Sequence, residues 1–472
     1  MMMSQIAEAL HASLHGDDVM ITGISKDTRN IHPGDLYVAL KGERFDGHQF
    51  VAEANLSGAV GALVSDSQSV DVPQVQVDDT RVALGQLAAY WRRKFTGKLI
   101  GITGSNGKTS VKEMCRKILA DYAGTREVLS TKGNLNNDIG LPLMLLELTE
   151  QHQFAVIEMG ANHVGEIDYL ASIARPDVAI VTNAGLAHLE GFGSLENIAK
   201  AKAEIYKGLS GSGVAVVNLD DAFSSLWIDY CSEYSAGKRV ITFSMLDDSA
   251  DVFAKLTADN CYQIIAPNDR AELQLKVPGK HNVMNALAAI AATLSLEVPL
   301  QDIVTSLSEF ENIQGRLTVL DAEAGFRVID DTYNANPLSV SAAIDVLADM
   351  QADTVLVLGD MAELGKDAEK LHGEIGDKAK SAGIKALYAT GKLCENTVNA
   401  FGENGFYFKN KNELINALNK KLTADEVVLV KGSRSAAMEE VVERILTPKI
   451  FQGKGGNKAT QDRLPLNNKR LN

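Results

Sequence analysis

Apolar residues recur along the chain in short runs, and segments with a helical period of 3.6 residues separate many of these runs. The runs predict strands at residues 21–25, 35–40, 60–66, 99–103, 154–159, 177–183, 213–219, 327–331, 354–359, 386–391 and 427–432. The helical periods predict helices at residues 80–95, 108–122, 283–296, 342–350, 368–383 and 437–446. Buried apolar strands that alternate with helices are typical of parallel sheets covered on both faces, so we expect an α/β protein.

The length of the chain and two breaks in its pattern predict three domains. At roughly 150 residues per domain, three is the central expectation for 472 residues. The pair Thr96-Gly97 ends the first alternation, and a new one begins near Gly315. The predicted limits are therefore a small α/β domain at 1–96, a central domain at 97–313, a C-terminal α/β domain at 314–448 and a polar, disordered tail at 449–472.

The charge and composition of the chain exclude several classes of protein. With 46 basic and 61 acidic residues the net charge is −15, whereas a nucleic-acid binder would show a basic excess. No apolar run reaches about 18 residues, so we expect no membrane span. The start of the chain lacks the features of a signal peptide. The 4 scattered cysteines contain no CxxC pair, which favours a cytoplasmic protein without a disulfide framework.

The segment GITGSNGKTS at residues 101–110 predicts a phosphate-binding loop. The full P-loop pattern fails at one position, since Ile102 stands where a glycine is expected. Glycines let backbone N–H groups turn toward phosphate oxygens, and a following helix adds a positive N-terminal end. The candidate nucleotide-binding residues are Gly104, Ser105, Asn106, Gly107, Lys108, Thr109 and Ser110. The alternative is a plain glycine turn that leads into a helix.

Carboxylate and imidazole groups follow two predicted strands of the central domain. Glu158 ends one strand and His188 follows the next, and ligand sites in α/β sheets lie beyond the carboxyl ends of strands. Together with the Thr109 hydroxyl they form a candidate site for divalent cations. Either residue alone fits a simpler role, as a turn residue or a helix cap. Lys202 stands in a lysine-rich segment typical of a solvated helix, and the residues alone do not select it.

Nine motifs occur together and in order between residues 101 and 434, and with the segment ISKDTRNIHPGDLYVALKGERFDGHQF at 24–50 they form one pattern over about residues 20–446. They are GITGSNGKTS, TKGNLNNDIGLP (131–142), VIEMGANHVGEI (156–167), TNAGLAHLEGFGS (182–194), GKHNVMNALAA (279–289), QGRL (314–317), DDTYNANPLS (330–339), LGDMAELG (358–365) and VKGSR (430–434). This combination resembles the Mur ligase family of peptidoglycan synthesis. LGDMAELG and VKGSR favour the branch that adds D-alanyl-D-alanine, and the DNPR motif of the branch that adds the third amino acid is absent.

The resemblance implies a fold and a reaction. The implied domains bind the UDP-substrate, hydrolyse ATP and, in a Rossmann-like C-terminal domain, bind the amino substrate. ATP would phosphorylate the carboxylate of a UDP-N-acetylmuramoyl-tripeptide, and D-alanyl-D-alanine would attack the acyl phosphate. The implied cofactors are ATP, two Mg²⁺ ions and a carbamate on Lys202. We expect a monomer with no nucleic-acid partner.

The resemblance also assigns roles to residues at matching positions. Lys108, Lys202 and His188 would be catalytic, and Thr109, Glu158 and His188 would face metal. Asn285, Arg316 and Asp331 would contact the nucleotide. The implied substrate residues are Thr28, Arg29, Asp46, His48, Asn134, Asn136, Asn137, Lys431, Ser433 and Arg434. Plain structural roles stay open for several, such as turn formation for the asparagines and an interdomain ion pair for Arg316.

Three functions compete at this point. The first is the ATP-dependent amide ligase that adds D-alanyl-D-alanine. The second is a related ligase, either the diaminopimelate-adding enzyme or folylpolyglutamate synthase, although the latter lacks the N-terminal UDP-binding pattern. The third is a protein that uses its nucleotide state as a switch on protein partners. Phosphate release that depends on substrate would separate an enzyme from a switch.

Overall fold

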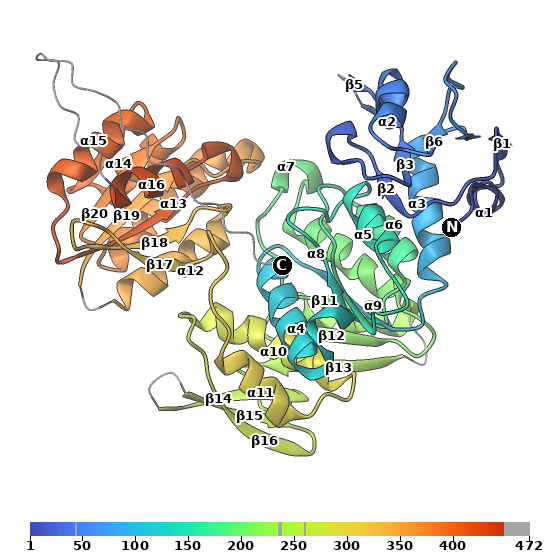
Figure 1. Ribbon diagram of the computed structural model, residues 1–472. Coiled ribbons are helices and arrows are strands. Elements are labelled where there is room, and N and C mark those ends of the chain that lie inside the picture. Colours follow the sequence, from blue (N-terminus) through green and yellow to red (C-terminus); the bar gives the residue numbers. More distant parts are fainter. Residues whose placement is uncertain (43–44, 235–237, 259–260, 351, 448–472) are drawn as a thin grey trace, which may run out of the picture.

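The computed structural model describes residues 1–42, 45–234, 238–258, 261–350 and 352–447. Three α/β units follow one another along the chain, and each has its own β-sheet. In Figure 1 the central unit, coloured cyan to yellow, lies between the blue N-terminal unit and the orange to red C-terminal unit. The predicted α/β architecture with three domains is confirmed. The predicted tail at 449–472 lies outside the described residues.

The N-terminal unit has a five-stranded sheet in the order β1-β7-β6-β3-β2, in which only the β1–β7 pair is antiparallel. Its elements are α1 (Met3–Ala9), β1 (Ser13–His15), β2 (Gly23–Ser25), η1 (Thr28–Asn30), β3 (Asp35–Val38), β4 (Lys41–Gly42), β5 (Phe45–Asp46), η2 (Gly47–Phe50), α2 (Val51–Leu56), β6 (Gly61–Val64), β7 (Gln74–Gln76) and α3 (Thr80–Arg92). Successive side chains of β3 point to opposite faces of the sheet and so belong to two hydrophobic cores. Leu36 packs on the side of α1 and α3, and Tyr37 packs on the opposite face.

The central unit begins with the elements that surround the phosphate loop. They are β8 (Lys98–Thr103), α4 (Lys108–Ala123), η3 (Thr125–Glu127), β9 (Val128–Ser130), α5 (Gly140–Leu146), β10 (Phe154–Glu158), α6 (Glu166–Ala174), β11 (Val178–Val181), α7 (Leu189–Phe192), α8 (Leu195–Ala203), η4 (Glu204–Gly208) and β12 (Val214–Asn218). It continues with α9 (Ser224–Tyr234), β13 (Arg239–Ser244), β14 (Val252–Ala258), β15 (Cys261–Ala266), β16 (Asp269–Gln274), α10 (Lys280–Leu294) and α11 (Leu300–Ser308).

The central sheet has nine strands in the order β16-β15-β14-β13-β12-β11-β8-β10-β9. Seven strands, in the order β9, β10, β8, β11, β12, β13 and β14, are joined by parallel pairing, and β15 and β16 extend the β14 edge by antiparallel pairing. The predicted parallel sheet thus has an antiparallel extension that the sequence pattern did not indicate. Strand β8 lies between β10 and β11, so their carboxyl ends meet beside the loop that follows β8.

Helices cover both faces of the central sheet, as the apolar runs predict. Along β8 the side chain of Ile100 belongs to a core with α4 and α10, whereas that of Leu99 belongs to a core with α5, α6 and α8. The alanine-rich helix α10 lies almost completely buried against α4. Since β8 is apolar on both sides, its end is held rigidly and can position the phosphate loop.

The C-terminal unit has a six-stranded sheet in the order β17-β18-β22-β19-β20-β21, and β17 is its one antiparallel strand within the described residues. Its elements are β17 (Thr318–Asp321), β18 (Arg327–Asp331), α12 (Pro337–Ala348), β19 (Asp353–Gly359), η5 (Gly365–Asp367), α13 (Ala368–Ser381), β20 (Ala386–Thr390), α14 (Cys394–Phe401), β21 (Gly405–Phe408), α15 (Lys411–Lys421), β22 (Glu426–Lys431), η6 (Arg434–Ala436) and α16 (Glu439–Leu446). Helices α12, α13 and α14 pack on one face, and α15 and α16 on the other.

All eleven predicted strands are present, and their ends differ from the predicted ones by at most two residues. The proposed domain limits fall between elements, since Thr96 lies between α3 and β8, and Ile313 lies between α11 and β17. The exact limits stay a prediction. No helix within the described ranges combines the length and the apolar character needed to cross a membrane.

Candidate functional site

The loop after β8 has the geometry of an anion cradle. Gly104 and Gly107 have φ values of +144° and +82°, which favour glycine. A Cβ on Gly104 would lie 1.9 Å from the Thr182 hydroxyl oxygen, and one on Gly107 would lie 2.3 Å from the Asn285 side-chain oxygen. Helix α4 begins directly at Lys108, and no side chain caps its first N–H groups. Those N–H groups are therefore available to an anion.

The Lys108 ammonium is folded back onto this loop. Its Nζ donates hydrogen bonds to the carbonyl oxygens of Gly104, at 2.7 Å, and Ser105, at 3.3 Å. Burial lowers the pKa of Lys108, and the Glu158 carboxylate opposes that shift. A phosphate group bound in the loop would offer the ammonium a stronger acceptor than these carbonyls.

Thr109 and Glu158 come together from different elements, as the sequence predicts. The Thr109 hydroxyl donates to Glu158 Oε2 at 3.0 Å, and the Asn136 amide donates to Oε1 at 2.8 Å. Glu158 is buried at the end of β10. A guanidinium nitrogen of Arg316 lies 3.4 Å from the Thr109 hydroxyl oxygen. The hydroxyl and carboxylate oxygens are the ligand type that Mg²⁺ prefers.

His188 does not lie with these two oxygens in a closed ligand set. It stands immediately before α7 in a left-handed conformation, with φ of 54°. Its Nδ1 forms an ion pair with the Glu363 carboxylate of the C-terminal unit. Burial lowers the pKa of His188, and the charge of Glu363 opposes that shift. The imidazole lines the same cavity as Thr109 and Glu158, but Glu363 occupies its Nδ1 side.

Lys202 is buried, although its sequence is typical of a solvated helix. Its side chain is 2% exposed, and its Nζ lies 5.3 Å from the centre of the Phe192 ring. Burial, followed by the charge of Lys108, lowers the pKa of Lys202 to about 7. A substantial fraction of this amine is therefore neutral at neutral pH, which is the form that reacts with carbon dioxide.

Two adjoining cavities divide the predicted residues into two groups. The first has a volume of about 670 Å³ and contains the phosphate loop with Glu158, His188 and the predicted asparagines 134, 136 and 137. The second has a volume of about 220 Å³ and contains Asn285, Asp331 and Lys431. Arg316 and residues 106–107 line both cavities. A ligand with a phosphate chain and an apolar ring would span the two.

One contact between the central and C-terminal units, and others within each unit, frame these cavities. The side chains of Asn106 and Asn336 form a reciprocal amide pair, with distances of 2.8 and 3.3 Å. The Arg316 guanidinium lies 4.2 Å from the centre of the Tyr333 ring, where it makes a cation–π contact. Asn183 accepts a hydrogen bond from the Asn106 backbone N–H at 2.9 Å. The site thus requires both units.

The three candidate amine-binding residues of the motif VKGSR do not meet in one cavity. Lys431 is buried and donates to Asp331 Oδ2 at 2.5 Å and to the Asn334 carbonyl at 2.9 Å. Ser433 lines a separate cavity of about 360 Å³ beside Asp360. Arg434 is exposed and pairs with a glutamate of α16 at 2.8 Å. In this structure Lys431 therefore holds Asp331 and the Asn334 backbone at the second cavity.

The four predicted UDP-site residues lie in two places of the N-terminal unit: Thr28 and Arg29 are in η1, and Asp46 and His48 are at the end of β5 and in η2. Arg29 is exposed and pairs with Asp27 at 2.6 Å. His48 is buried, with Nδ1 at 2.7 Å from Asp46 Oδ1 and Nε2 accepting from the Ser65 backbone N–H at 2.8 Å. Both ring nitrogens of His48 thus contact groups inside the domain, and its role at the UDP-substrate stays a prediction. A cavity of about 760 Å³ in this unit is lined by other residues, among them Lys41, Ser65 and Arg81.

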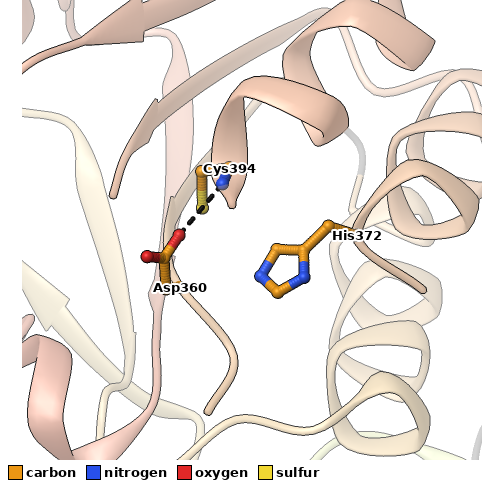
Figure 2. Close-up of side chains that lie close together, drawn as sticks. All are labelled: Asp360, His372 and Cys394. Carbon is orange, nitrogen blue, oxygen red and sulfur yellow. Dashed lines mark hydrogen bonds between the residues drawn. The ribbon is translucent and has the colours of Figure 1, made fainter. Parts of the chain in front are cut away.

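Asp360, His372 and Cys394 form a second cluster, with possible ligand atoms within 4.8 Å of one another (Figure 2). His372 Nε2 accepts from the Met361 N–H at 3.0 Å, and Nδ1 lies 2.7 Å from the Ala368 carbonyl oxygen. Asp360 Oδ1 accepts from the backbone N–H groups that begin α14. Because both ring nitrogens are engaged, we assign the cluster to the packing of α13 and α14 on β19.

Several residues around the first cavity were missed in the sequence. Tyr333 and Asn336 lie within DDTYNANPLS, and Glu363 lies within LGDMAELG, so the motifs already contained them. Arg81 and Asp138 have weaker signals, a helix start and the edge of an asparagine-rich loop. Asn183 is the last residue of a predicted strand, where a side chain beside a ligand is expected.

Comparison with known proteins identifies the family. Three family models match in order: "Mur ligase family, catalytic domain" at residues 20–92, "Mur ligase middle domain" at 102–293 and "Mur ligase, glutamate ligase domain" at 315–434. The UDP-N-acetylmuramoyl-tripeptide–D-alanyl-D-alanine ligase of Escherichia coli K12 is 43% identical over 449 residues, which cover 94% of this chain and 98% of that protein. The chain belongs to the Mur ligase family.

Solved structures of the family have the same architecture. A crystal structure of MurF from Acinetobacter baumannii superposes with a TM-score of 0.87 at 37% identity and covers 94% of this chain and 98% of that one. MurF from Thermotoga maritima, solved in complex with ADP, has a TM-score of 0.79 at 28% identity, with coverages of 90% and 96%. The similarity therefore extends over all three units of this Mur ligase.

Proposed function

We propose that this Mur ligase joins D-alanyl-D-alanine to a UDP-N-acetylmuramoyl-tripeptide at the expense of ATP, in the synthesis of peptidoglycan precursors. The observation that carries the proposal is the 43% identity to a ligase of that name over nearly the full length of both chains. The phosphate loop, whose cavity is completed by the C-terminal unit, supports the use of a nucleotide. We also propose that the protein is cytoplasmic, because it would act on peptidoglycan precursors and because its four cysteines are free.

ATP is proposed to lie across the two adjoining cavities. Its phosphates would follow the loop and the N-terminus of α4, and its nucleoside would enter the second cavity beside Asn285 and Asp331. Arg316 lines both cavities and would neutralise phosphate charge. The ADP complex of the Thermotoga maritima relative supports nucleotide binding by this fold.

The reaction is proposed to proceed in two displacements. An oxygen of the peptide carboxylate attacks the γ-phosphorus, the bond to the β-phosphate oxygen breaks, and ADP leaves. The amine of D-alanyl-D-alanine then attacks the acyl carbon, loses a proton, and phosphate leaves as the amide forms. Lys108 and Arg316 would neutralise the charge of the phosphate oxygens that the carboxylate approaches, and residues of the C-terminal unit that line the cavity would limit the access of water to the acyl phosphate.

The residues of the first cavity fit a divalent cation. Thr109 and Glu158 contribute oxygens that already lie 3.0 Å apart, and Glu158 is buried and negatively charged. His188 would complete this set once its Nδ1 leaves Glu363. Two Mg²⁺ ions, when bound, would offset the repulsion between phosphate and carboxylate.

Lys202 is proposed to carry a carbamate, which would present an anionic oxygen to the metal side of the cavity. Its burial and its pKa of about 7 support this, because carbamylation requires a neutral amine. Lys202→Ala should lose most activity, and short carboxylic acids should restore part of it. A mass spectrum with a free amine, together with no rescue, would assign Lys202 a structural role.

An amine panel tests the proposed function. Purified protein with ATP, Mg²⁺ and the UDP-tripeptide should release one phosphate per amide formed when D-alanyl-D-alanine is added. Diaminopimelate, L-lysine, D-glutamate and L-alanine should give no product. A preference for one of those single amino acids would overturn the substrate assignment and leave the ligase chemistry intact. Phosphate release without any amine requirement would favour a nucleotide switch instead.

A further inference from the structure

Arg81 stands where two cavities of the molecule meet. It lines the 670 Å³ cavity that contains the phosphate loop, and it also lines the 760 Å³ cavity of the N-terminal unit. Among the described residues that line these cavities, it is the one shared by both. A long ligand that runs from the N-terminal unit to the phosphate loop would therefore pass the Arg81 side chain.

The backbone of Arg81 is held in place by a hydrogen bond, whereas its guanidinium is accessible to solvent. Arg81 is in the first turn of α3, where its backbone N–H donates to the Asp79 carboxylate at 2.7 Å. Its side chain is 54% exposed and forms an ion pair with Asp138 of the central unit. The Asp79 carboxylate is already engaged in capping the helix, so Asp138 is the direct anionic partner of the guanidinium.

The other lysine and arginine side chains that line the first cavity have contacts different from those of Arg81. Arg316 contacts Thr109, and Lys108 folds onto the phosphate loop. The segment from Asn136 to Asp138 links the loop side to Arg81, because Asn136 donates to Glu158 and Asp138 pairs with Arg81. A peptide carboxylate activated at the loop would thus leave the remaining anionic groups of the same substrate on the Arg81 side.

We propose that Arg81 is a substrate-binding residue that holds an anionic group of the UDP-peptide, and that Asp138 occupies its guanidinium when that group is absent. The inference rests on the proposed function, since the ligand class comes from it. A carboxylate of the peptide and the diphosphate both have the required chemistry, and a guanidinium binds either in a bidentate manner.

Two matched variants distinguish this role from a purely structural ion pair. Arg81→Gln and Asp138→Asn break the same pair, but only the first removes the cation. We expect Arg81→Gln to raise the KM for the UDP-tripeptide roughly 10- to 100-fold, as for loss of a hydrogen bond to a charged group, with the KM for ATP unchanged. Asp138→Asn should leave the KM for the UDP-tripeptide unchanged or lower it. Equal increases in both variants, or an unchanged KM in Arg81→Gln, would overturn the proposal.

Binding of two partial ligands identifies the anionic group. UDP-N-acetylmuramate carries the diphosphate without the peptide, and N-acetylmuramoyl-tripeptide carries the peptide without the diphosphate. Calorimetry on the wild type and Arg81→Gln should show a loss confined to one of the two ligands, and that ligand contains the group. No loss for either would contradict the inference. Wild-type turnover with the amine panel is measured alongside, so that failure of the proposed function itself is seen separately.

Discussion

The imidazole of His188 and the carboxylate of Glu363 form an ion pair across the boundary between the central and C-terminal units. The contact is extended by the backbone, since the Glu190 N–H donates to the Glu363 carbonyl at 3.2 Å. Glu363 adopts a left-handed conformation with φ of 60°. A cation that binds through Nδ1, as proposed above, competes with this carboxylate for the same nitrogen, whereas binding through Nε2 would leave the pair intact.

Glu363→Gln is therefore expected to strengthen the response to Mg²⁺. The two side chains are 32% and 54% exposed, and a pair of that kind contributes at most about 1 kcal/mol, a factor of about 5 in affinity. The half-saturating Mg²⁺ concentration for phosphate release should fall by up to about that factor. Glu369→Gln, which replaces an exposed glutamate in the first turn of α13, serves as the control. A higher Mg²⁺ requirement in Glu363→Gln would mean that the pair assists metal binding.

Lys202→Met should stabilise the fold, and more so at low pH. The pKa of Lys202 is lowered from 10.5 to about 7 in the folded protein, chiefly by burial. Between pH 10.5 and pH 7 Lys202 is protonated in the unfolded chain but not in the folded chain, so the free energy of unfolding of the wild type decreases as the pH falls. Below about pH 7 the folded chain is protonated as well, and the full destabilisation by the buried charge remains. The penalty removed is on the order of several kcal/mol.

Urea unfolding in carbon-dioxide-free buffer at pH 6 and pH 9.5 measures this difference. The gain for Lys202→Met over the wild type should be larger at pH 6 by several kcal/mol. An equal gain at both pH values would show that the amine titrates normally. Lys200→Met, which replaces an exposed lysine of the same helix, should show no such pH dependence.

Asn336 has two separable functions in the structure. Its side-chain oxygen caps α12 by accepting from the Ser339 backbone N–H at 2.9 Å. Its side-chain amide nitrogen donates to the Asn106 side chain of the phosphate loop at 2.8 Å. Serine retains the cap and loses the bridge, whereas alanine loses both. We expect Asn336→Ala to destabilise the protein by about 1 kcal/mol and Asn336→Ser by much less. Both should raise the KM for ATP by about 2- to 10-fold, and an unchanged KM would deny the bridge a role in the site.

Thiol reactivity should be confined to Cys261. Cys115, Cys231 and Cys394 are buried, and burial raises the pKa of each of these three thiols. Cys261 is partly exposed. Iodoacetamide at pH 8 should add one label to the native protein and four to the unfolded protein, as counted by mass spectrometry. Cys261→Ser should abolish the native label, and labelling of a second site would show that a core opens.

Local chemistry made the phosphate loop and half of the described strands predictable, whereas distant contacts could not be predicted. Gly107 and Lys108 act through backbone geometry within a few residues, and β8 is a continuous apolar run. Strands β15 and β16 alternate buried and exposed residues and lack such a run, so the antiparallel edge was missed. The pairing of Asn106 with Asn336 joins positions 230 residues apart, which no local pattern contains.

The resemblance assigns roles to residues whose surroundings in the structure differ from one residue to the next. Thr109 and Glu158 do lie together, because β8 and β10 are neighbours in the sheet. His48 was predicted at the UDP site, but both of its ring nitrogens are engaged inside the domain. The buried state of Lys202 was invisible in a lysine-rich helix, since the packing of Phe192 over it depends on the preceding loop. The substrate roles of these residues stay predictions.

The dependence of the nucleotide cavities on the C-terminal unit has a consequence for biosynthesis. A ribosome completes the phosphate loop and Glu158 long before it adds Arg316, Asp331 and Asn336, so the nascent chain carries an incomplete site during most of its synthesis. A chain that stops before those residues has a folded loop but lacks the groups that would enclose ATP. Prematurely terminated products should then neither bind nor consume the ATP of the cell.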